Sequence, residues 1–433
     1  MNAPSLVFYA DDFTGATDAL ATAARAGLRS LLLFGAPDAR RLEALGELDV
    51  LGIAGAARSM GPAQMAQELA PVAQLARRLG PRILHYKTCS TFDSAPAVGS
   101  IGEAVRLLRP AMPADWVALV GGQPNLGRYC LFGNLFAAAG AGGEVFRIDR
   151  HPTMSRHPVT PMHEADLRLH LAAQGLERIE LLPWTVHTHG DDALWARLQA
   201  LRAAGDGTAV LFDAAEAAHL AGIGRVLWRA AADAPLLAAG PSSVIEACAA
   251  SMPKQPVPGP QEGIAPARGP VLVLAGSLSP VTARQVAVAH SFELRRLDAP
   301  RLALDAGYRS EAARELAAAL HAGRHVLACT VATDGASAGV AALELARAGG
   351  LLLAQTLAQA PVARLGIAGG DTSSWGVRAL DAWGLVHAGL VAPGAPLCRL
   401  RSDLPALDGM ELMLKGGQMG GDDLFERLVH GSA

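Results

Sequence analysis

The residues most able to do chemistry follow two short apolar segments in the N-terminal half. Asp11 and Asp12 directly follow the segment Leu6–Ala10, and a turn with the sequence TCSTFDS (residues 88–94) follows the segment Ile83–Lys87. An ammonium group can hold a carboxylate, and hydroxyl and carboxylate side chains can hold the hydroxyls of a sugar. The turn therefore predicts a binding site for a polyhydroxy acid.

Each of these residues also has an ordinary structural explanation. Asp12 could cap the helix predicted after it, because its side-chain oxygen would satisfy free backbone N–H groups. Arg58, just beyond the apolar segment Val50–Ala54, could be a bidentate carboxylate clamp or a solvated surface charge. Two acidic residues at the end of a strand are costly to bury, so for Asp11 and Asp12 we favour a chemical role.

Three glycine-rich turns in the C-terminal half share one design. An apolar segment ends in small residues and a helical pattern follows, at GSLSP (276–280), GGDTSS (369–374) and GGQMGG (416–421). Glycine allows close backbone approach, and free N–H groups at the start of a helix attract phosphate. The alternative is an ordinary strand–helix connection capped by Ser or Thr. Walker A, GxGxxG and protein-kinase motifs are absent, so a nucleotide would need another architecture.

Two histidine-containing segments give weaker signals. His187, His189 and Asp191 form an HxHxD pattern, but Asp192 stands where a di-zinc hydrolase loop has a further His. We favour a strand end with Asp191 as a helix cap. The polar, Pro-rich segment His151–Pro161 is either an ordered loop over a site or a surface connection.

Short apolar segments that alternate with amphipathic ones must position these groups. Such alternation is typical of α/β layers around parallel sheets, whose strand ends gather ligand-binding turns at one edge. The segments predicted as strands are Leu6–Ala10, Leu31–Phe34, Val50–Ala54, Ile83–Lys87, Trp116–Val120, Ile179–Leu182, Val210–Phe212, Val271–Ala275, His325–Cys329, Leu365–Ala368, Leu397–Leu400 and Glu411–Leu414. The clearest helical patterns are Ala16–Ala26, Pro62–Leu79 and Asp192–Ala203.

One boundary divides this pattern. Residues 253–270 contain six Pro and three Gly, a composition that disfavours both a helix and a central strand. We predict a linker at 253–270 between one domain at residues 1–252 and another at residues 271–433. The expected fold class is α/β, with two domains that are each a mainly parallel sheet flanked by helices.

Composition narrows the class of protein. The chain of 433 residues carries 37 Lys plus Arg against 40 Asp plus Glu, a formal net charge of −3. This balance gives no support for nucleic acid or an anionic membrane as a partner. Five widely spaced cysteines without a CxxC fit unpaired thiols in a reducing compartment. Neither a signal-peptide pattern nor a run of about 18 apolar residues occurs, so we expect a cytoplasmic protein.

Taken together, the motifs resemble the four-carbon acid sugar kinases, the family of 3-oxo-tetronate, D-threonate and D-erythronate kinases. The matching segments follow the family's order and span nearly the whole chain. They are ADDFTGATDA (10–19), KTCSTFDS (87–94), RHPVTPM (156–162), AGSLSP (275–280), AGGDTSS (368–374) and LKGGQMGG (414–421). The CSTFDS sequence is most similar to the 3-oxo-tetronate branch.

The resemblance implies a sugar-acid-binding N-terminal domain, a nucleotide-binding C-terminal domain and an active site in the cleft between them. The substrate residues it implies are Asp12, Arg58, Lys87, Ser90, Thr91, Asp93 and His157. The nucleotide residues it implies are Ser277, Ser279, Gly369, Gly370, Asp371, Thr372, Gly416, Gly417 and Gly420. It also implies ATP and Mg²⁺, with the ion held mainly through the ATP phosphates.

The catalytic group is expected among the carboxylates. Phosphoryl transfer needs alignment and charge neutralisation, and the acceptor hydroxyl passes its proton to a nearby carboxylate. Of Asp12, Asp11 and Asp93 we favour Asp12, because the adjacent helix N-terminus would keep it ionised. We therefore predict an ATP-dependent kinase of a small sugar acid, with a homodimer left open as its assembly. The alternatives are a non-catalytic sugar-acid or nucleotide sensor and a metal-dependent hydrolase.

Overall fold

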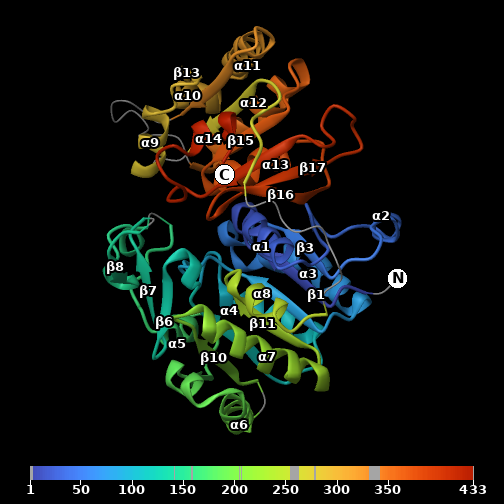
Figure 1. Cartoon of the computed structure of the whole chain (residues 1–433), viewed down its shortest axis with the longest axis vertical. Helices are drawn as coiled ribbons and strands as arrows, with labels where there is room; N and C mark the ends of the chain where they lie inside the picture. The colour runs from blue at the N-terminus through green and yellow to red at the C-terminus, as the bar shows by residue number, and fades with distance from the viewer. Residues whose placement is uncertain are drawn as a thin grey trace. The chain divides into compact units, whose positions relative to one another are not determined.

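The computed structural model describes residues 3–140, 142–157, 159–203, 205, 207–253, 263–276, 279–330 and 342–432. The chain forms two compact units, Met1–Gly259 (unit 1) and Pro260–Ala433 (unit 2). Each unit is an α/β layer structure with a mainly parallel sheet flanked by helices, so the predicted fold class is confirmed (Figure 1). Among the described residues, no helix has both the length and the apolar character needed to cross a membrane.

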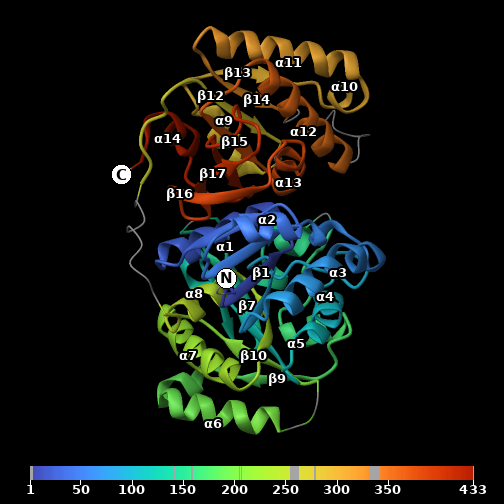
Figure 2. The same ribbon diagram turned by 90° about the vertical axis from the view of Figure 1, so that its right-hand side faces the viewer.

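Unit 1 contains a parallel sheet with the strand order β2-β3-β1-β4-β11-β5-β10-β9. The strands are β1 Leu6–Ala10, β2 Ser30–Leu33, β3 Val50–Ala54, β4 Ile83–Lys87, β5 Val117–Gly121, β9 Ile179–Leu182, β10 Ala209–Asp213 and β11 Leu236–Gly240. The helices are α1 Phe13–Arg25, α2 Ala39–Ala44, α3 Pro62–Leu79, α4 Ile101–Leu108, α5 Leu167–Ala172, α6 Asp191–Arg202, α7 Ala217–Asp233 and α8 Ser243–Ala249. Helices α1, α7 and α8 cover one face of the sheet, and α3, α4 and α5 cover the other (Figure 2).

The local sequence explains these elements. Strands β1, β3 and β4 are buried along their whole length, as expected of continuous apolar runs between two helical layers. Helix α3 begins with Pro62 in its first turn and ends at Gly80, whose positive φ of 58° suits glycine. A small antiparallel sheet of β6 Arg128–Leu131, β7 Asn134–Ala138 and β8 Val145–Arg147 follows β5, and its short strands did not stand out in the sequence.

Unit 2 has the strand order β13-β14-β12-β15-β18-β17-β16, parallel as far as β18 and antiparallel beyond it. The strands are β12 Val271–Ala275, β13 Phe292–Arg296, β14 His325–Cys329, β15 Arg364–Ala368, β16 Gly384–Ala392, β17 Ala395–Arg401 and β18 Glu411–Lys415. The helices are α9 Pro280–Ala287, α10 Ala299–Leu304, α11 Ala306–His321, α12 Ala342–Gln359, α13 Gly370–Arg378 and α14 Leu424–His430. Helices α9 and α14 lie on one face, and α10 to α13 lie on the other (Figure 2).

The Pro/Gly-rich segment predicted as a linker falls partly outside the described residues, since positions 254–262 are not among them. Its later part packs on unit 2. Ile264 forms a β-bridge with Ser432, and the Ala267 N–H donates to the Val429 carbonyl at 2.9 Å. These residues therefore belong to the fold of unit 2, which begins before residue 271.

Candidate active site

The acid-site motifs of unit 1 meet at the carboxyl edge of three adjacent strands, β3, β1 and β4. The Asp11 N–H donates to the Lys87 carbonyl at 3.1 Å, and the Arg58 N–H donates to the Asp11 carbonyl at 3.1 Å. Parallel register places the ends of β1 and β4 side by side, with Ala10 opposite Lys87. The fold thus brings together segments that lie almost 80 positions apart in the chain.

Arg58 is held by two carboxylates of unit 1. Its guanidinium donates to Asp11 at 2.7 and 3.2 Å and to Asp12 at 3.0 Å through two nitrogens. Burial works to lower the pKa of Arg58, but Asp11 and Asp12 raise it well above its usual value. These four bonds leave one of the five N–H donors, so the bidentate clamp suggested by the sequence is not available in this arrangement.

Asp12 combines this ion pair with helix capping. Its Oδ1 accepts the N–H of Gly15 at 2.8 Å, which makes it the N-cap of α1. Both carboxylate oxygens of Asp12 are therefore engaged. Burial raises the pKa of the neighbouring Asp11, against the lowering effect of Arg58.

Lys87 differs from Arg58 because its ammonium has no hydrogen-bond or ion-pair partner among the described residues, although the side chain is buried. It passes directly over Gly15, where a Cβ atom would lie 1.9 Å from Nζ. Gly15 is thus required by the path of the lysine. The charge of Asp11 acts on Lys87 without a direct bond, and a buried cation that lacks a direct partner is costly, so an anionic ligand would lower that cost.

The turn after β4 holds a chain of polar contacts. Thr91 Oγ1 donates to Asp93 Oδ1 at 2.5 Å and lies 2.9 Å from the Cys89 sulfur, and Ser90 is buried beside them. Phe92, between the two polar residues, takes a positive φ of 54°, which is strained for an aromatic residue. Burial works to raise the pKa of Asp93, but Arg58 and the Thr91 bond outweigh it and lower that pKa.

His157 comes from the Pro-rich loop and acts on this turn. Its Nδ1 accepts the Thr160 N–H at 3.1 Å, and its ring lies close enough to Asp93 to help lower the pKa of that carboxyl. The same loop is folded on itself at His151, whose Nδ1 accepts the N–H groups of Thr153 and Met154 at 3.2 Å. These contacts favour the ordered loop over the plain surface connection.

Sequence reasoning missed a second buried cation, Arg128 at the start of β6. Its Nε has no hydrogen-bond partner among the described residues, and burial lowers its pKa. The charges of Cys89, Asp18 and Asp93 act on it, so it lies near the turn after β4. A lone arginine in a segment without a motif gave no signal in the sequence.

Asp18 was also missed, although it lies within the first motif. Its Oδ2 accepts from Ser242 at 2.5 Å and from Gln123 at 3.2 Å, which joins α1 to the ends of β11 and β5. Five neighbouring strands of unit 1 therefore contribute polar side chains to one edge.

In unit 2 the three glycine-rich turns follow β12, β15 and β18, which are neighbours in the sheet. Ser279 caps α9 and donates to the Gly417 carbonyl at 2.7 Å, and the Gly369 N–H donates to the Lys415 carbonyl at 2.9 Å. A Cβ atom on Gly276 would lie 2.3 Å from Thr372 Oγ1. The turns are thus in contact.

The other nucleotide residues expected in unit 2 are placed as follows. Gly370, Asp371 and Thr372 form the first turn of α13, and Gly416 and Gly420 belong to the turn after β18. Ser277 lies outside the described residues. The glycine-rich edge also contains a residue that was not predicted, the fully buried Lys415.

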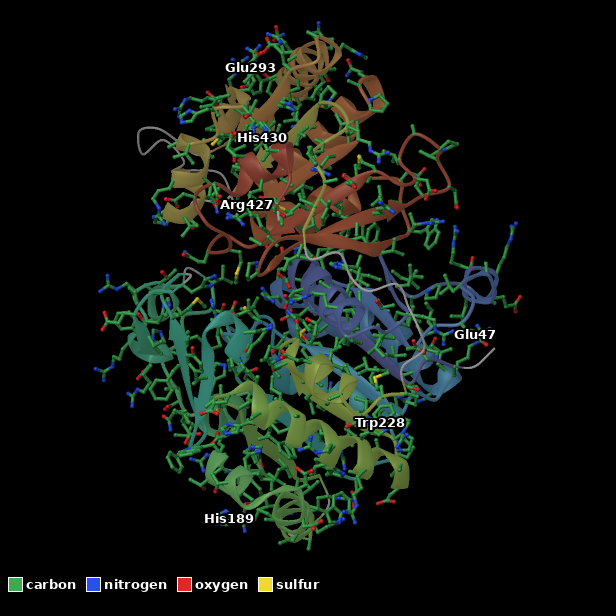
Figure 3. The ribbon with its side chains drawn as sticks, in the orientation of Figure 1. Glu47, His189, Trp228, Glu293, Arg427 and His430 are labelled. Atoms are coloured by element: carbon green, nitrogen blue, oxygen red, sulfur yellow. The ribbon has the colours of Figure 1, made fainter. Side chains whose placement is uncertain are left out.

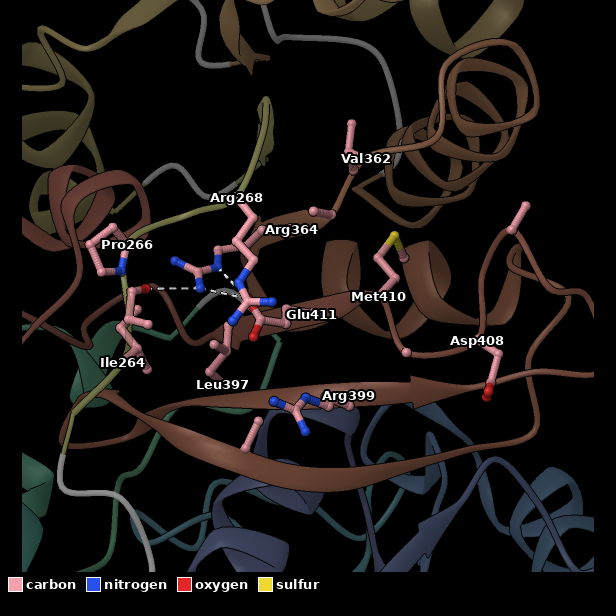
Figure 4. A pocket seen from close by; sticks show the side chains of 15 residues that line it. Ile264, Pro266, Arg268, Val362, Arg364, Leu397, Arg399, Asp408, Met410 and Glu411 are labelled. Atoms are coloured by element: carbon pink, nitrogen blue, oxygen red, sulfur yellow. Dashed lines mark hydrogen bonds and ion pairs between the residues drawn. The ribbon is translucent and has the colours of Figure 1, made fainter.

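A pocket of ≈ 520 Å³ lies at the other edge of the unit 2 sheet, where β15 and β18 begin (Figure 4). Arg364 in its wall donates to Glu411 at 2.5 and 2.8 Å and to the carbonyls of Leu428 and Ala265. This arginine ties the segment around Ala265 to the sheet. Arg364 thus has four of its five N–H donors engaged, and the pocket lies at the opposite ends of the strands from the glycine-rich turns, so we assign it no part in the chemistry.

The HxHxD pattern is not a metal site in the described structure. His189 is exposed at the surface beside α6 (Figure 3), and Asp191 pairs with Arg225. The N-cap of α6 is Gly190 and Asp191 is the first residue of the helix, so the prediction of Asp191 as the cap was wrong. No cluster of three or more His, Cys, Asp or Glu side chains that could hold a metal ion occurs in the described part of the chain.

Comparison with known proteins agrees with this arrangement. Residues 6–248 match the sugar-binding N-terminal domain, and residues 272–425 match the nucleotide-binding C-terminal domain. The chain is 40% identical to the 3-oxo-isoapionate kinase of Paraburkholderia graminis, over 98% of this chain and 94% of the relative. It is 32% identical to the 3-oxo-tetronate kinase of Cupriavidus necator, over 98% and 96%.

The fold is shared with a solved structure of Haemophilus influenzae protein HI1011. The TM-score is 0.72 at 25% sequence identity, and 98% of each chain is covered. Together with the two domain matches and the kinase relatives, this similarity spans both units. The chain belongs to the four-carbon acid sugar kinase family.

Proposed function

We propose that this protein transfers the γ-phosphoryl group of ATP to a hydroxyl of a 3-oxo sugar acid. The observation that carries the acid specificity is the pair Lys87 and Arg128. Both cations are buried in unit 1, and neither has an ion-pair partner among the described residues. A substrate carboxylate would neutralise them. The names of the two kinase relatives also specify substrates that are acids.

The turn after β4 supplies the groups for the sugar hydroxyls. Asp93 is hydrogen-bonded to Thr91 through Oδ1 and also to Cys89, but it forms no ion pair among the described residues. In contrast, both oxygens of Asp12 are taken by Arg58 and Gly15. We therefore assign proton acceptance to Asp93, and we assign to Asp12 and Asp11 the task of holding Arg58.

Unit 2 would bind ATP through its glycine-rich turns. Gly369, Gly370, Thr372, Gly417 and Gly420 lie on adjoining turns at one sheet edge, and Ser279 and Gly416 support them. Mg²⁺ would be held mainly by the phosphates, where it would neutralise the charge that develops during transfer. Transfer across a shared cleft, as implied by the family resemblance, remains part of this proposal.

The test is an ADP-release screen with ATP and Mg²⁺ against a panel of four-carbon and branched 3-oxo acids and their hydroxy forms. We expect turnover with a 3-oxo acid and little or none with the matching uncharged sugar. ADP release that is equal with and without a carboxylate in the substrate would contradict the acid site.

A further inference from the structure

The carboxyl end of β18 carries a charge that no ion pair balances among the described residues of unit 2. Lys415 has no exposed surface, and its Nζ donates to Thr282 Oγ1 at 2.9 Å, Gln285 Oε1 at 2.5 Å and the Gly417 carbonyl at 3.5 Å. All three acceptors are neutral. The Phe425 ring also lies against the ammonium, with its centroid 5.9 Å from Nζ.

Thr282 and Gln285 of helix α9 also bind the backbone carbonyls of residues 416–421, which form the loop after β18. The Gly417 carbonyl accepts from Ser279, Thr282 and Lys415. Gln285 Nε2 donates to the carbonyls of Met419, Gly420 and Gly421 at 3.0, 3.3 and 2.9 Å. Four carbonyl groups of one short loop therefore face α9.

A planar trans peptide points its N–H opposite to its C=O. Because the carbonyls of Gly417, Met419 and Gly420 face α9, the N–H groups of Gln418, Gly420 and Gly421 face away from it. None of these three N–H groups has an acceptor among the described residues. Free backbone N–H groups within one short loop can form an anion-binding nest.

We propose that Lys415 and Gln285 are positioning residues of the nucleotide site, which hold the loop carbonyls inward so that the Gln418, Gly420 and Gly421 amides face the ATP phosphates. This inference rests on the proposed function and extends it from the glycines to the side chains that orient them. It also assigns the buried ammonium a counter-charge, namely the phosphates on the other side of the loop.

The ionised side chains on the surrounding elements are engaged elsewhere. Arg284 of α9 pairs with Asp422 of the loop at 3.1 Å, and Arg427 of α14 pairs with Asp423 at 2.9 Å. Glu426 of α14 binds Ser291 and His430; Figure 3 labels Arg427 and His430 on this helix. Burial lowers the pKa of Lys415 to about 7. Phosphates nearby would raise that pKa again, so ATP binding would take up a proton.

The first experiment measures ATP–Mg²⁺ binding to the full chain by calorimetry. Lys415→Met removes the charge, and Gln285→Glu keeps an oxygen for Lys415 but loses the N–H donors to the loop. We expect the Kd for ATP to rise about 10- to 100-fold in each, the effect of losing a charged hydrogen bond. Arg284→Ala, on the same helix and beside the same loop, is the control and should stay within about twofold.

The second experiment measures proton uptake by the wild type, and it uses Lys415→Met only as the reference. Wild-type binding heats are compared at pH 7.5 in buffers of different ionisation enthalpy, and Lys415→Met reports the contribution of ATP itself. Proton uptake should be larger in the wild type, whose Kd should rise as the pH passes above about 7.

The outcomes separate the two levels of the proposal. If the wild type does not bind ATP, the proposed function is overturned. If the wild type binds ATP but Lys415→Met and Gln285→Glu bind it equally well, or if proton uptake is the same in wild type and Lys415→Met, the positioning role alone is overturned.

Discussion

Both units place a cation at the carboxyl edge of their sheet, but they treat its charge in opposite ways. In unit 1, Arg58 is neutralised by Asp11 and Asp12 through four hydrogen bonds. In unit 2, the acceptors of Lys415 among the described residues are all neutral. An internally paired charge is already stabilised and has little to gain from a ligand, whereas an unpaired one gains much from an anion.

The same distinction holds inside unit 1. Lys87 and Arg128 are buried without ion pairs among the described residues, while Arg58 beside them is paired. Charge pairing therefore separates residues that organise the site from residues that are ready to bind a ligand. Sequence motifs alone gave Arg58 and Lys87 the same role.

The largest expected effect tests the difference between Asp12, which forms an ion pair with Arg58, and Asp93, which forms none among the described residues. Asp93→Asn should lower kcat by about 10²- to 10⁴-fold, because it removes the proton acceptor while keeping the side-chain shape. The KM for ATP should barely change. Steady-state kinetics with saturating ATP measures the effect.

Asp12→Asn is the matched control, since it also removes one carboxylate charge from unit 1. It should raise the KM for the acid by loosening Arg58 and reduce kcat much less than Asp93→Asn does. A dead Asp12→Asn enzyme beside a nearly normal Asp93→Asn enzyme would return the base role to Asp12, as the sequence first suggested.

The second prediction concerns the unpaired cations. Lys87→Met should raise the KM for the acid about 30- to 150-fold, which corresponds to about 2–3 kcal/mol for a charged hydrogen-bond partner. Arg128→Met should act in the same direction. The KM for ATP serves as the internal control.

Arg58→Met should behave differently, because it leaves Asp11 and Asp12 buried without a counter-charge. We expect it to lower the thermal stability of the protein more than Lys87→Met does. Equal melting temperatures for the two variants would remove the distinction between a paired and an unpaired cation.

Two glycines give a third and smaller test, one in each unit. Gly15→Ala would place a Cβ 1.9 Å from Lys87 Nζ, and Gly276→Ala would place one 2.3 Å from Thr372 Oγ1. Each side chain must move, and a shift near 1 Å in a binding site can cost up to about 100-fold. We expect about a 10-fold rise in the KM for the acid in the first variant and for ATP in the second.

Crossed kinetics check this pair of variants. Gly15→Ala should leave the Kd for ATP unchanged, and Gly276→Ala should leave acid binding unchanged. If both variants weakened the same ligand, the division of labour between the units would be wrong.

The fold was largely predictable from the sequence, because the central strands are buried on both faces and read as continuous apolar runs. Six of the predicted strands, including Leu6–Ala10 and Val271–Ala275, have the bounds observed in the structure. Strands β6 to β8 were missed because they are short and half-exposed, and β11 was missed because its LLAAG sequence is indistinct among alanine-rich helices.

The site residues were predictable only where a motif concentrates them. Asp12, Lys87 and Asp93 stand in such motifs, whereas Arg128 stands alone in the sequence and is brought to the turn after β4 by the fold. Pairing could not be predicted either. Whether Arg58 meets a ligand or Asp11 depends on the ends of β1 and β3 lying side by side, which is a property of sheet order.

The last and smallest effect follows from the unpaired charge of Lys415 in the absence of ATP. Burial lowers its pKa from 10.5 to about 7, so between these values the unfolded chain binds more protons than the folded one. Stability therefore rises with pH in this window, by up to about 1.4 kcal/mol for each pH unit, and the rise begins near pH 7. Lys415→Met has no proton to lose and should show no such rise.

Hydrogen exchange of peptides that span residues 411–421, from pH 7 to pH 9 and corrected for the intrinsic rate, measures this rise in stability locally. Increasing protection in the wild type and constant protection in Lys415→Met are the expected result, whereas parallel curves would mean that Lys415 is already satisfied by its neutral partners. The direction is opposite to that of ATP binding, which should weaken over the same range, so the charge that favours the nucleotide lowers the stability of the empty site.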